Sequence, residues 1–501
     1  MEAGQVLKNR MWTLGEGLLL AGLSVMVAWL SVRRGGTDTA VLVFGGAAAL
    51  VLMLAPSRWM LSCFVLLMMA GHQFRSPLIY PLAGVEWHPR ELLLLLLLAH
   101  FAVKVMTGEA DLRPDIMHYF VLCYAAFFAV IACRGIWRQM PIQDVIAECR
   151  YPIFLAAYFV FVACAGGARE LPNYLRLMLY FSVGIALLSI AYFLYAFATG
   201  HVVSIQNWLG EFVQRRIGPF LLQSVRANGH MFYEVCVVVL AALILCPDTP
   251  QRRRALYTAL IGLFLIAIVI TMMRTAYAAL FLSLLVLAVL FLPAELQMIA
   301  GFLGAVAAVG CVVAGGVLLS GNALIPGLET SLQGRFVEIS GALDMFKQYP
   351  LLGAGMGSKF TGLGFVSKTA IRSVAQADFQ TVHNVWMYFL FKGGLAGMFL
   401  VGLGLGGLVL RAHRTIGALS SRSDQYLMRG LLAALCGQLA ASLTMPRLTY
   451  PNGAVFLSMM ACAFVMMTRH DGPAALAPSS ENGYTPREKT SADGERISNH
   501  D

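Results

Sequence analysis

The polar stretch from Ser320 to Gly394 carries the residue types best suited to chemistry. His383 stands where this stretch meets the next apolar segment, and Asn384 follows it directly. Imidazole is the side chain best suited to proton transfer near neutral pH, and the start of a helix is a rigid mount for it. His383 is therefore a candidate catalytic base. The structural alternative stays open, because a single histidine at a membrane interface more often has a structural role.

Two arginines are candidates for binding an anion. Arg274 lies between two apolar segments with almost no loop, and Arg335 lies near the start of the amphipathic pattern Gly334–Gln348. A guanidinium stays charged at any pH, and its planar fork matches phosphate oxygens. Each arginine also has a structural interpretation. Arg274 can reach the lipid headgroups with its charged end, and Arg335 can form a weak surface ion pair with Glu338, one turn later.

The pattern Gly334–Gln348 predicts a short amphipathic helix. Its apolar side chains recur at helical spacing, at Phe336, Ile339, Leu343 and Phe346. Charged residues occupy the other faces, as expected for a helix lying at the outer membrane surface. Pro350 ends the pattern, and the glycines that follow predict a tight turn over Gly353–Gly357.

The rest of the chain must position these residues from within a membrane. Of its 501 residues, 59% are hydrophobic and 12% are charged, whereas soluble proteins carry about twice that charged fraction. A helix crosses the hydrocarbon with about 20 apolar residues, and an open sheet cannot cross it. The apolar segments therefore predict an all-α polytopic bundle of about 12 to 14 transmembrane helices. The net charge of +10 fits contact with anionic lipid or a phosphorylated ligand. No basic-aromatic module points to nucleic acid.

Four regions follow one another along the chain. We expect N-terminal transmembrane helices over residues 1–215 and a core over residues 216–410. The core includes a large outer loop, residues 320–383, which we expect to carry short helices. C-terminal transmembrane helices over residues 411–468 and a disordered tail over residues 469–501 complete the chain.

The charged loops give the orientation. The run Arg252–Arg254 lies in a short loop, and the tail after Arg469 is too charged to cross the membrane. The positive-inside rule therefore places both in the cytoplasm, and the loop 320–383 outside. Many Lys and Arg residues nevertheless fall in the loops assigned to the outer side. Either the orientation is reversed, or the outer face is kept basic for a ligand.

In their order along the chain, these features resemble the bacterial O-antigen ligase and polymerase superfamily. The resemblance covers residues from about Arg216 to Leu410, and the N-terminal half matches only as membrane helices. The family's usual Ser before its first arginine is Met273 here. The shared features are, in order, Arg216–Phe220 before the apolar segment Met231–Cys246, then Arg274, Gly334-Arg335, Pro350–Gly355, His383-Asn384 and Gly393–Gly397.

The resemblance implies a class C glycosyltransferase-like membrane enzyme, multi-pass in the inner membrane, with its active site facing the periplasm. Members act on glycans carried by undecaprenyl diphosphate. By the matching motifs, Arg274 and Arg335 would hold the diphosphate and His383 would be the catalytic base. Arg216 and Asn384 would be further substrate contacts. The implied partners are the carrier-linked glycan, a glycan or lipid A-core acceptor, membrane lipids, and flippase and chain-length regulator proteins.

We expect no cofactor and no metal ion. The cysteines are scattered without metal-binding spacing, and the run Glu109–Asp111, which has the shape of an Asp-x-Asp motif, falls in a loop assigned to the inner side. The expected function is polymerisation of the repeats of an exopolysaccharide or O-antigen. The alternative is an O-antigen ligase that transfers the glycan to lipid A-core. A transporter or flippase for the lipid-linked glycan is the rival from another class.

Overall fold

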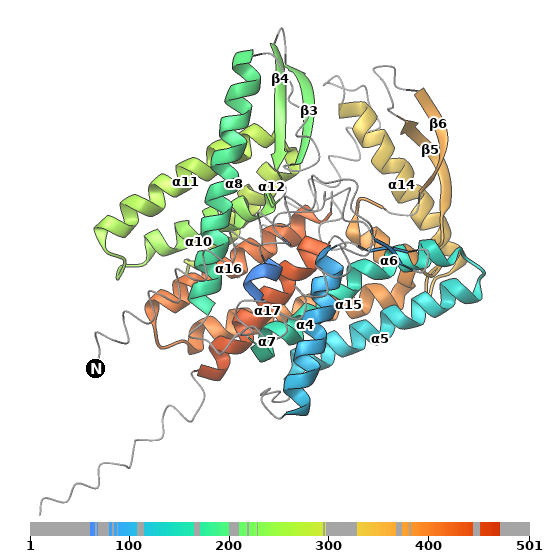
Figure 1. Cartoon of the computed structure of the whole chain (residues 1–501), viewed down its shortest axis with the longest axis horizontal. Coiled ribbons are helices and arrows are strands. Elements are labelled where there is room, and N and C mark those ends of the chain that lie inside the picture. Colours follow the sequence, from blue (N-terminus) through green and yellow to red (C-terminus); the bar gives the residue numbers. More distant parts are fainter. Residues whose placement is uncertain are drawn as a thin grey trace, which may run out of the picture.

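The computed structural model in Figure 1 is a helical bundle with three two-stranded hairpins among its described residues. It describes residues 61–65, 68, 80–82, 85–87, 89–107, 115–164, 171–199, 210–217, 220–227, 229–293, 296, 328–366, 373–379, 382–443 and 451–470. The sequence has further apolar segments at Leu14–Val32, Ala40–Leu54 and Met298–Leu319, each of which we expect to form a helix. They lie outside the described residues, and so does the tail from residue 471.

The described elements follow one another from the first strand to the last helix. In chain order they are β1 (Tyr80–Leu82), β2 (Val85–Trp87), α4 (Pro89–Met106), α5 (Ile116–Trp137), α6 (Ile142–Ile153), η1 (Phe154–Ala156), α7 (Ala157–Cys164), α8 (Leu171–Thr199), β3 (Gly210–Ile217), β4 (Phe220–Ala227), α10 (Met231–Leu245), α11 (Gln251–Thr271), α12 (Arg274–Leu290), α14 (Leu328–Gln348), β5 (Phe360–Val366), β6 (Ser373–Phe379), α15 (Val385–Ala418), α16 (Arg422–Ala441) and α17 (Pro451–His470).

The described helices confirm the predicted class of all-α polytopic membrane protein. Five of them are long and apolar enough to cross a membrane: Ile116–Trp137, Ile142–Val162, Asn173–Thr199, Gln251–Thr271 and Val385–Ala418. Four shorter apolar helices accompany them: Leu93–Met106, Met231–Leu245, Thr275–Leu290 and Val455–Met467. Helices satisfy every backbone polar group within themselves, which is why apolar segments of this length adopt them.

One part of the bundle is built by α10, α11, α12 and α16. Close packing is possible because Gly437 faces α12, where an added Cβ would lie 2.6 Å from the Ala279 carbonyl oxygen. The rings of Phe291, just after α12, and Tyr426, early in α16, have centroids 5.0 Å apart. The two helices are therefore antiparallel, and the end of α16 lies beside the start of α12 at Arg274.

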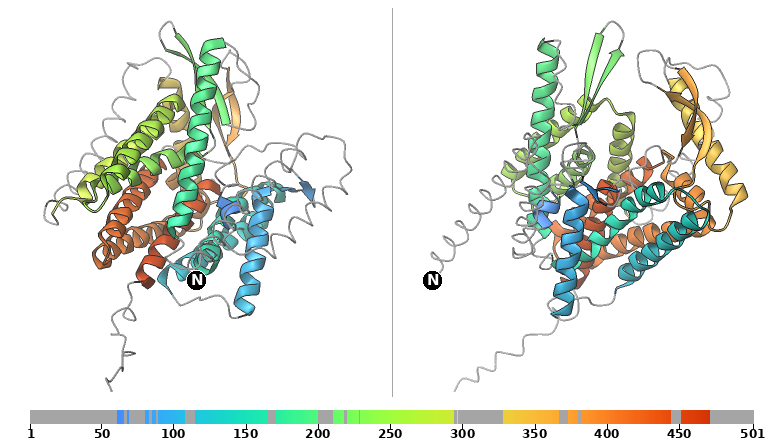
Figure 2. Two further views of the ribbon diagram at one scale, coloured as in Figure 1. Left: turned by 60° about the vertical axis from the view of Figure 1, so that its left-hand side comes forward. Right: turned by 45° about the vertical axis from the view of Figure 1, so that its right-hand side comes forward.

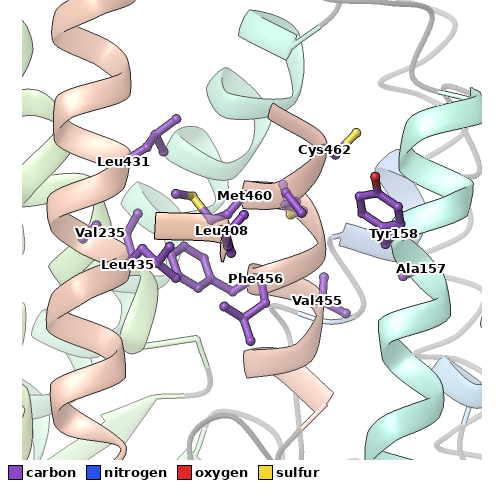
Figure 3. Packing of buried hydrophobic residues seen from close by; sticks show 14 of the residues in the cluster. Ala157, Tyr158, Val235, Leu408, Leu431, Leu435, Val455, Phe456, Met460 and Cys462 are labelled. Atoms are coloured by element: carbon purple, nitrogen blue, oxygen red, sulfur yellow. The ribbon is translucent and has the colours of Figure 1, made fainter. Parts of the chain in front are cut away.

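The rest of the bundle shares a continuous hydrophobic core with these four helices. Figure 3 shows its centre, where Phe456 and Met460 of α17 lie between Leu435 of α16 and Tyr158 of α7. Above the bundle, the β3–β4 hairpin, α14 and the β5–β6 hairpin project from the same side (Figures 1 and 2). The candidate site residues come from this side of the molecule.

The helix α15 is interrupted at Gly394, whose φ and ψ are 62° and −156°. A break leaves N–H and C=O groups without their helical partners. The turn that follows α14 supplies partners for them through four backbone hydrogen bonds: Ala354 N–H to Phe391 C=O (2.8 Å), Gly355 N–H to Lys392 C=O (3.0 Å), Leu395 N–H to Pro350 C=O (2.8 Å) and Ala396 N–H to Leu351 C=O (3.1 Å). Irregular backbone inside a membrane protein is tolerated when it is satisfied in this way.

Glycines are required at this junction. The predicted tight turn is confirmed, with φ of 65° at Gly353, 85° at Gly355 and 77° at Gly357. A Cβ on Gly353 would collide with the Lys392 carbonyl group, and one on Gly394 would lie 2.5 Å from the Leu351 carbonyl oxygen. The turn and the broken helix therefore form one rigid unit.

The loop 320–383, which the sequence assigned to the outer side, differs in part from the expectation. The amphipathic helix predicted over Gly334–Gln348 is present as α14, which begins earlier, at Leu328. The β5–β6 hairpin follows it, with Phe360 opposite Phe379 and Val366 opposite Ser373. The sequence predicts short helices in this loop and gives no sign of the strands, because antiparallel pairing depends on the partner strand as well as on local pattern.

Candidate active site

Three side chains meet where α14 packs against the start of α15. His383 Nδ1 lies 2.8 Å from Glu338 Oε1 and 2.9 Å from Oε2, and the His383 backbone amide donates to Oε2 at 2.9 Å. One guanidinium nitrogen of Arg335 lies 3.5 and 3.4 Å from the same two oxygens. Glu338 thus joins two of the residues that the sequence predicted.

The local structure explains this arrangement. Residues three apart on a helix share a face, so α14 presents Arg335 and Glu338 together. The side-chain oxygen of Asn384 accepts from the amides of Trp386 (3.0 Å) and Met387 (3.1 Å), and so caps the start of α15. His383 is thereby held directly before a capped helix. The proposed role of Asn384 as a substrate contact stays a prediction.

Burial sets the electrostatics of the cluster. The Glu338 side chain is 8% exposed, whereas those of Arg335 and His383 are 35% and 43% exposed. Desolvation raises the pKa of Glu338 to about 7, although the Arg335 guanidinium acts in the opposite direction. The Glu338 carboxyl therefore gains or loses its proton near neutral pH. Nε2 of His383 forms no hydrogen bond with any residue that the structure describes.

Arg274 is the first residue of α12. Only Met272 and Met273 separate it from the end of α11, and Met272 has left-handed backbone angles. The end of α16 lies beside this point, and the Ser442 carbonyl there accepts from the Val385 amide at 3.0 Å. The starts of α12 and α15 are therefore at the same end of the bundle, and so are the backbones of Arg274 and His383.

Arg216 lies near the tip of the β3–β4 hairpin, opposite Leu221. Nearer the base, Val225 packs with Tyr192 of α8 and Ile270 of α11. Ile270 precedes Arg274 by four residues, so the hairpin rises from the same end of the bundle (Figure 2). The Arg216 backbone thus lies near the tip of a hairpin that the sequence did not predict, and its role as a substrate contact stays a prediction.

Arg134 and Arg138, at the C-terminal end of α5, have a structural role. Arg134 Nε donates to the Gly353 carbonyl at 2.9 Å, and Arg138 donates to the Ala354 carbonyl at 2.8 Å. Arg138 also donates to the Tyr349 hydroxyl at 2.6 Å and stacks 4.0 Å above that ring. Both side chains fix the turn after α14, which explains part of the basic charge on this side.

Lys392 is fully buried in α15, beside the turn. Its Nζ lies 2.6 Å from Glu148 Oε1 and 2.6 Å from the Ser358 carbonyl oxygen. The other Glu148 oxygen accepts from the Gly357 amide at 3.0 Å. Glu148 belongs to α6, so this buried ion pair ties α6, α15 and the turn together. The partner lies 244 residues away in the chain, and no local signal could have identified it.

Part of the chain matches a known protein family. Residues 259–402 match the family model described as O-antigen ligase. This segment contains α12, α14, the β5–β6 hairpin and the first part of α15, and hence Arg274, Arg335, Glu338 and His383. The resemblance seen in the sequence is confirmed over this segment, which does not include Arg216. A search of curated proteins found no match to the chain.

Proposed function

We propose that the protein is a membrane glycosyltransferase, because residues 259–402 match the family model described as O-antigen ligase. It moves a glycan from undecaprenyl diphosphate to an acceptor hydroxyl. The observation that carries the proposal is the contact of Arg335 and His383 with one carboxylate. A guanidinium, which is suited to binding phosphate, thereby stands beside an imidazole, which is suited to accepting a proton, and transfer from a sugar diphosphate uses both kinds of group.

The reaction exchanges one bond at the anomeric carbon for another. The acceptor oxygen bonds to that carbon and releases its proton to Nε2 of His383, while the bond to the phosphate oxygen breaks. The electron pair of the broken bond stays on the diphosphate, where Arg274 and Arg335 stabilise the developing charge. We propose that the reaction needs no metal ion, because the two guanidinium groups supply positive charge at the leaving group.

We propose that the acceptor is a second carrier-linked glycan, so that the protein polymerises the repeats of an exopolysaccharide or O-antigen. The many apolar segments of the sequence and the long loop 320–383 support this choice. The description of the matched family, O-antigen ligase, favours a second candidate, in which the glycan is transferred to lipid A-core.

Deletion of the gene, followed by gel analysis of the surface glycan, separates these two functions. Loss of a polymerase leaves single repeat units, whereas loss of a ligase leaves finished polymer on the carrier lipid. Complementation with the wild-type gene should restore the original pattern. A surface glycan unchanged by the deletion would contradict both functions.

A transporter or flippase for the same lipid-linked glycan is the rival function. It would need charged groups along a path through the bilayer. The buried Lys392, a candidate for such a group, is instead bonded to Glu148 and to the backbone of Ser358. Transport of labelled lipid-linked glycan by the purified protein, with no new glycosidic bond, would favour the rival.

Alanine in place of Arg274 or Arg335 is expected to lower the rate of transfer by about 100- to 1000-fold. Each change removes a charge-assisted donor to the leaving diphosphate. Lysine should restore little activity, because it cannot match two oxygens at once. Initial rates with lipid-linked donor, at equal protein levels, measure the effect. Arg429→Ala, in the first half of α16, is the control and should keep its rate. Near-normal activity of either test variant would show that the arginine has a structural role only, at the lipid headgroups for Arg274 or in the ion pair with Glu338 for Arg335.

We propose that the protein lies in the inner membrane with its active site facing the periplasm. A cysteine at Lys347, whose side chain is 74% exposed, should then react with an impermeant maleimide in spheroplasts. Ser358 is unsuitable for this purpose because it is fully buried. A cysteine at Arg253 is the control and should react only after lysis. Mass spectrometry of the labelled peptides distinguishes them from the native cysteines, and the reverse pattern would overturn the orientation.

A further inference from the structure

Glu338 is the part of the site that the sequence assigned only to a weak surface ion pair. In the structure this residue is 6% exposed and lies between Arg335 and His383. Burying a carboxylate costs free energy unless other groups bond to it. Glu338 bonds to Arg335 and His383, two of the residues that the proposed reaction uses. Its position therefore bears on the reaction as well as on the stability of α14.

We propose that Glu338 is the positioning residue of this site. It holds the His383 ring with Nε2 toward the acceptor, and it keeps the Arg335 guanidinium beside that base. The inference rests on the proposed function for what Nε2 and Arg335 contact.

The geometry fixes His383 in two ways. The carboxylate contacts Nδ1 at 2.8 and 2.9 Å, and it also accepts the backbone amide of His383 at 2.9 Å. Ring and backbone are therefore tied to one group, which opposes rotation of the ring. A carboxylate only accepts hydrogen bonds, so it selects the tautomer that carries its proton on Nδ1. The lone pair of Nε2 is then free to take the acceptor proton.

The charge of Glu338 serves the reaction as well. When Nε2 takes a proton, the imidazolium that forms is stabilised by the adjacent carboxylate, as in a Ser-His-Asp triad. The contact to Arg335 is longer, at 3.4 and 3.5 Å, and the arginine is partly exposed. Arg335 can therefore turn to a diphosphate without breaking a short hydrogen bond, whereas His383 stays bound.

The surroundings of Glu338 contain few other charges. Among the described residues, the charged or titratable groups in contact with it are Arg335 on its own helix and His383 before α15. The strand β5 packs against α14 and carries no titratable side chain. Burial raises the pKa of Glu338 to about 7, so its charge is lost as the pH falls below neutrality.

The first test compares Glu338→Gln with Glu338→Asp. Glutamine keeps the shape but not the charge, so kcat should fall by about 100- to 10000-fold with little change in KM for the donor. Aspartate should restore part of the rate. The unfolding temperature of the Gln variant should not fall, because a neutral amide is buried at lower cost than a carboxylate.

Asp344→Asn is the control for this test and should keep full activity. Asp344 lies on the same helix and is also paired with a residue three positions away, Lys347. Full activity of Glu338→Gln, or a loss that follows only from lower stability, would overturn the proposal.

The second test needs no glycosyl transfer. Diethyl pyrocarbonate reacts with neutral imidazole, and mass spectrometry of the His383 peptide gives the extent of reaction at each pH. Without the carboxylate, the imidazolium loses stabilisation, so the half-maximal pH of the reaction should be lower in Glu338→Gln than in the wild-type protein. Asp344→Asn should leave it in place. An unchanged profile in Glu338→Gln would overturn the role of Glu338, whereas inactive wild-type protein with the expected shift would contradict only the proposed function.

Discussion

Replacing His383 with alanine is expected to lower the rate of glycosyl transfer by about 100- to 10000-fold. Binding of the lipid-linked donor should persist, because the arginines proposed to hold the diphosphate remain. Initial rates and donor-binding titrations of the purified protein measure the two effects separately. His413→Ala is a suitable control, because His413 is exposed in the later part of α15, beyond the break. We expect this control to keep both activity and binding.

The same histidine should set the acid side of the pH–rate profile. Only a neutral imidazole accepts a proton, so the rate should fall as the pH decreases through the range in which His383 is protonated. Because burial raises the pKa of Glu338 to about 7, lowering the pH through this value also removes the carboxylate that supports the ring. Both changes act in the same direction. A chelator should leave the rate unchanged. Loss of donor binding in His383→Ala, or a pH profile that survives the substitution, would place the base elsewhere.

Replacing Lys392 with methionine is expected to lower the free energy of unfolding by about 3 to 5 kcal/mol. The substitution removes the ammonium group that contacts Glu148 and the Ser358 carbonyl in the interior. A buried carboxylate then loses its compensating charge, and the turn that fills the break of α15 loses one of its attachments. Reversible denaturation in mixed micelles, followed by circular dichroism, measures the change.

Two further variants identify the cause of that loss. Lys347→Met removes a lysine from the ion pair with Asp344, whose side chains are 74% and 61% exposed, and should cost less than about 1 kcal/mol. The double variant Lys392→Met with Glu148→Gln should be more stable than Lys392→Met alone, because it no longer buries an uncompensated charge. Equal losses in the two lysine variants would show that burial of the Lys392 pair is not the cause.

The sequence by itself determined the class of the protein and much of the outer loop. Apolar length predicts a membrane helix, since every backbone polar group must be satisfied inside the segment. The periodicity of residues 334–348 and the glycines at 353, 355 and 357 likewise act within a few residues. These local signals predicted α14 and the turn after it. The same kind of signal singled out Arg274, Arg335 and His383, because their chemistry depends on residue type.

Only the tertiary structure decided what these residues contact. Arg335 and Glu338 share a helix, but His383 follows Glu338 by 45 residues and reaches it through the packing of α14 on α15. The pKa of Glu338 rises because neighbouring elements exclude water from it. Lys392 finds its partner Glu148 at a separation of 244 residues, and the break at Gly394 is filled by a distant turn. Burial and pairing of charge depend on several segments at once, so a local pattern cannot specify them.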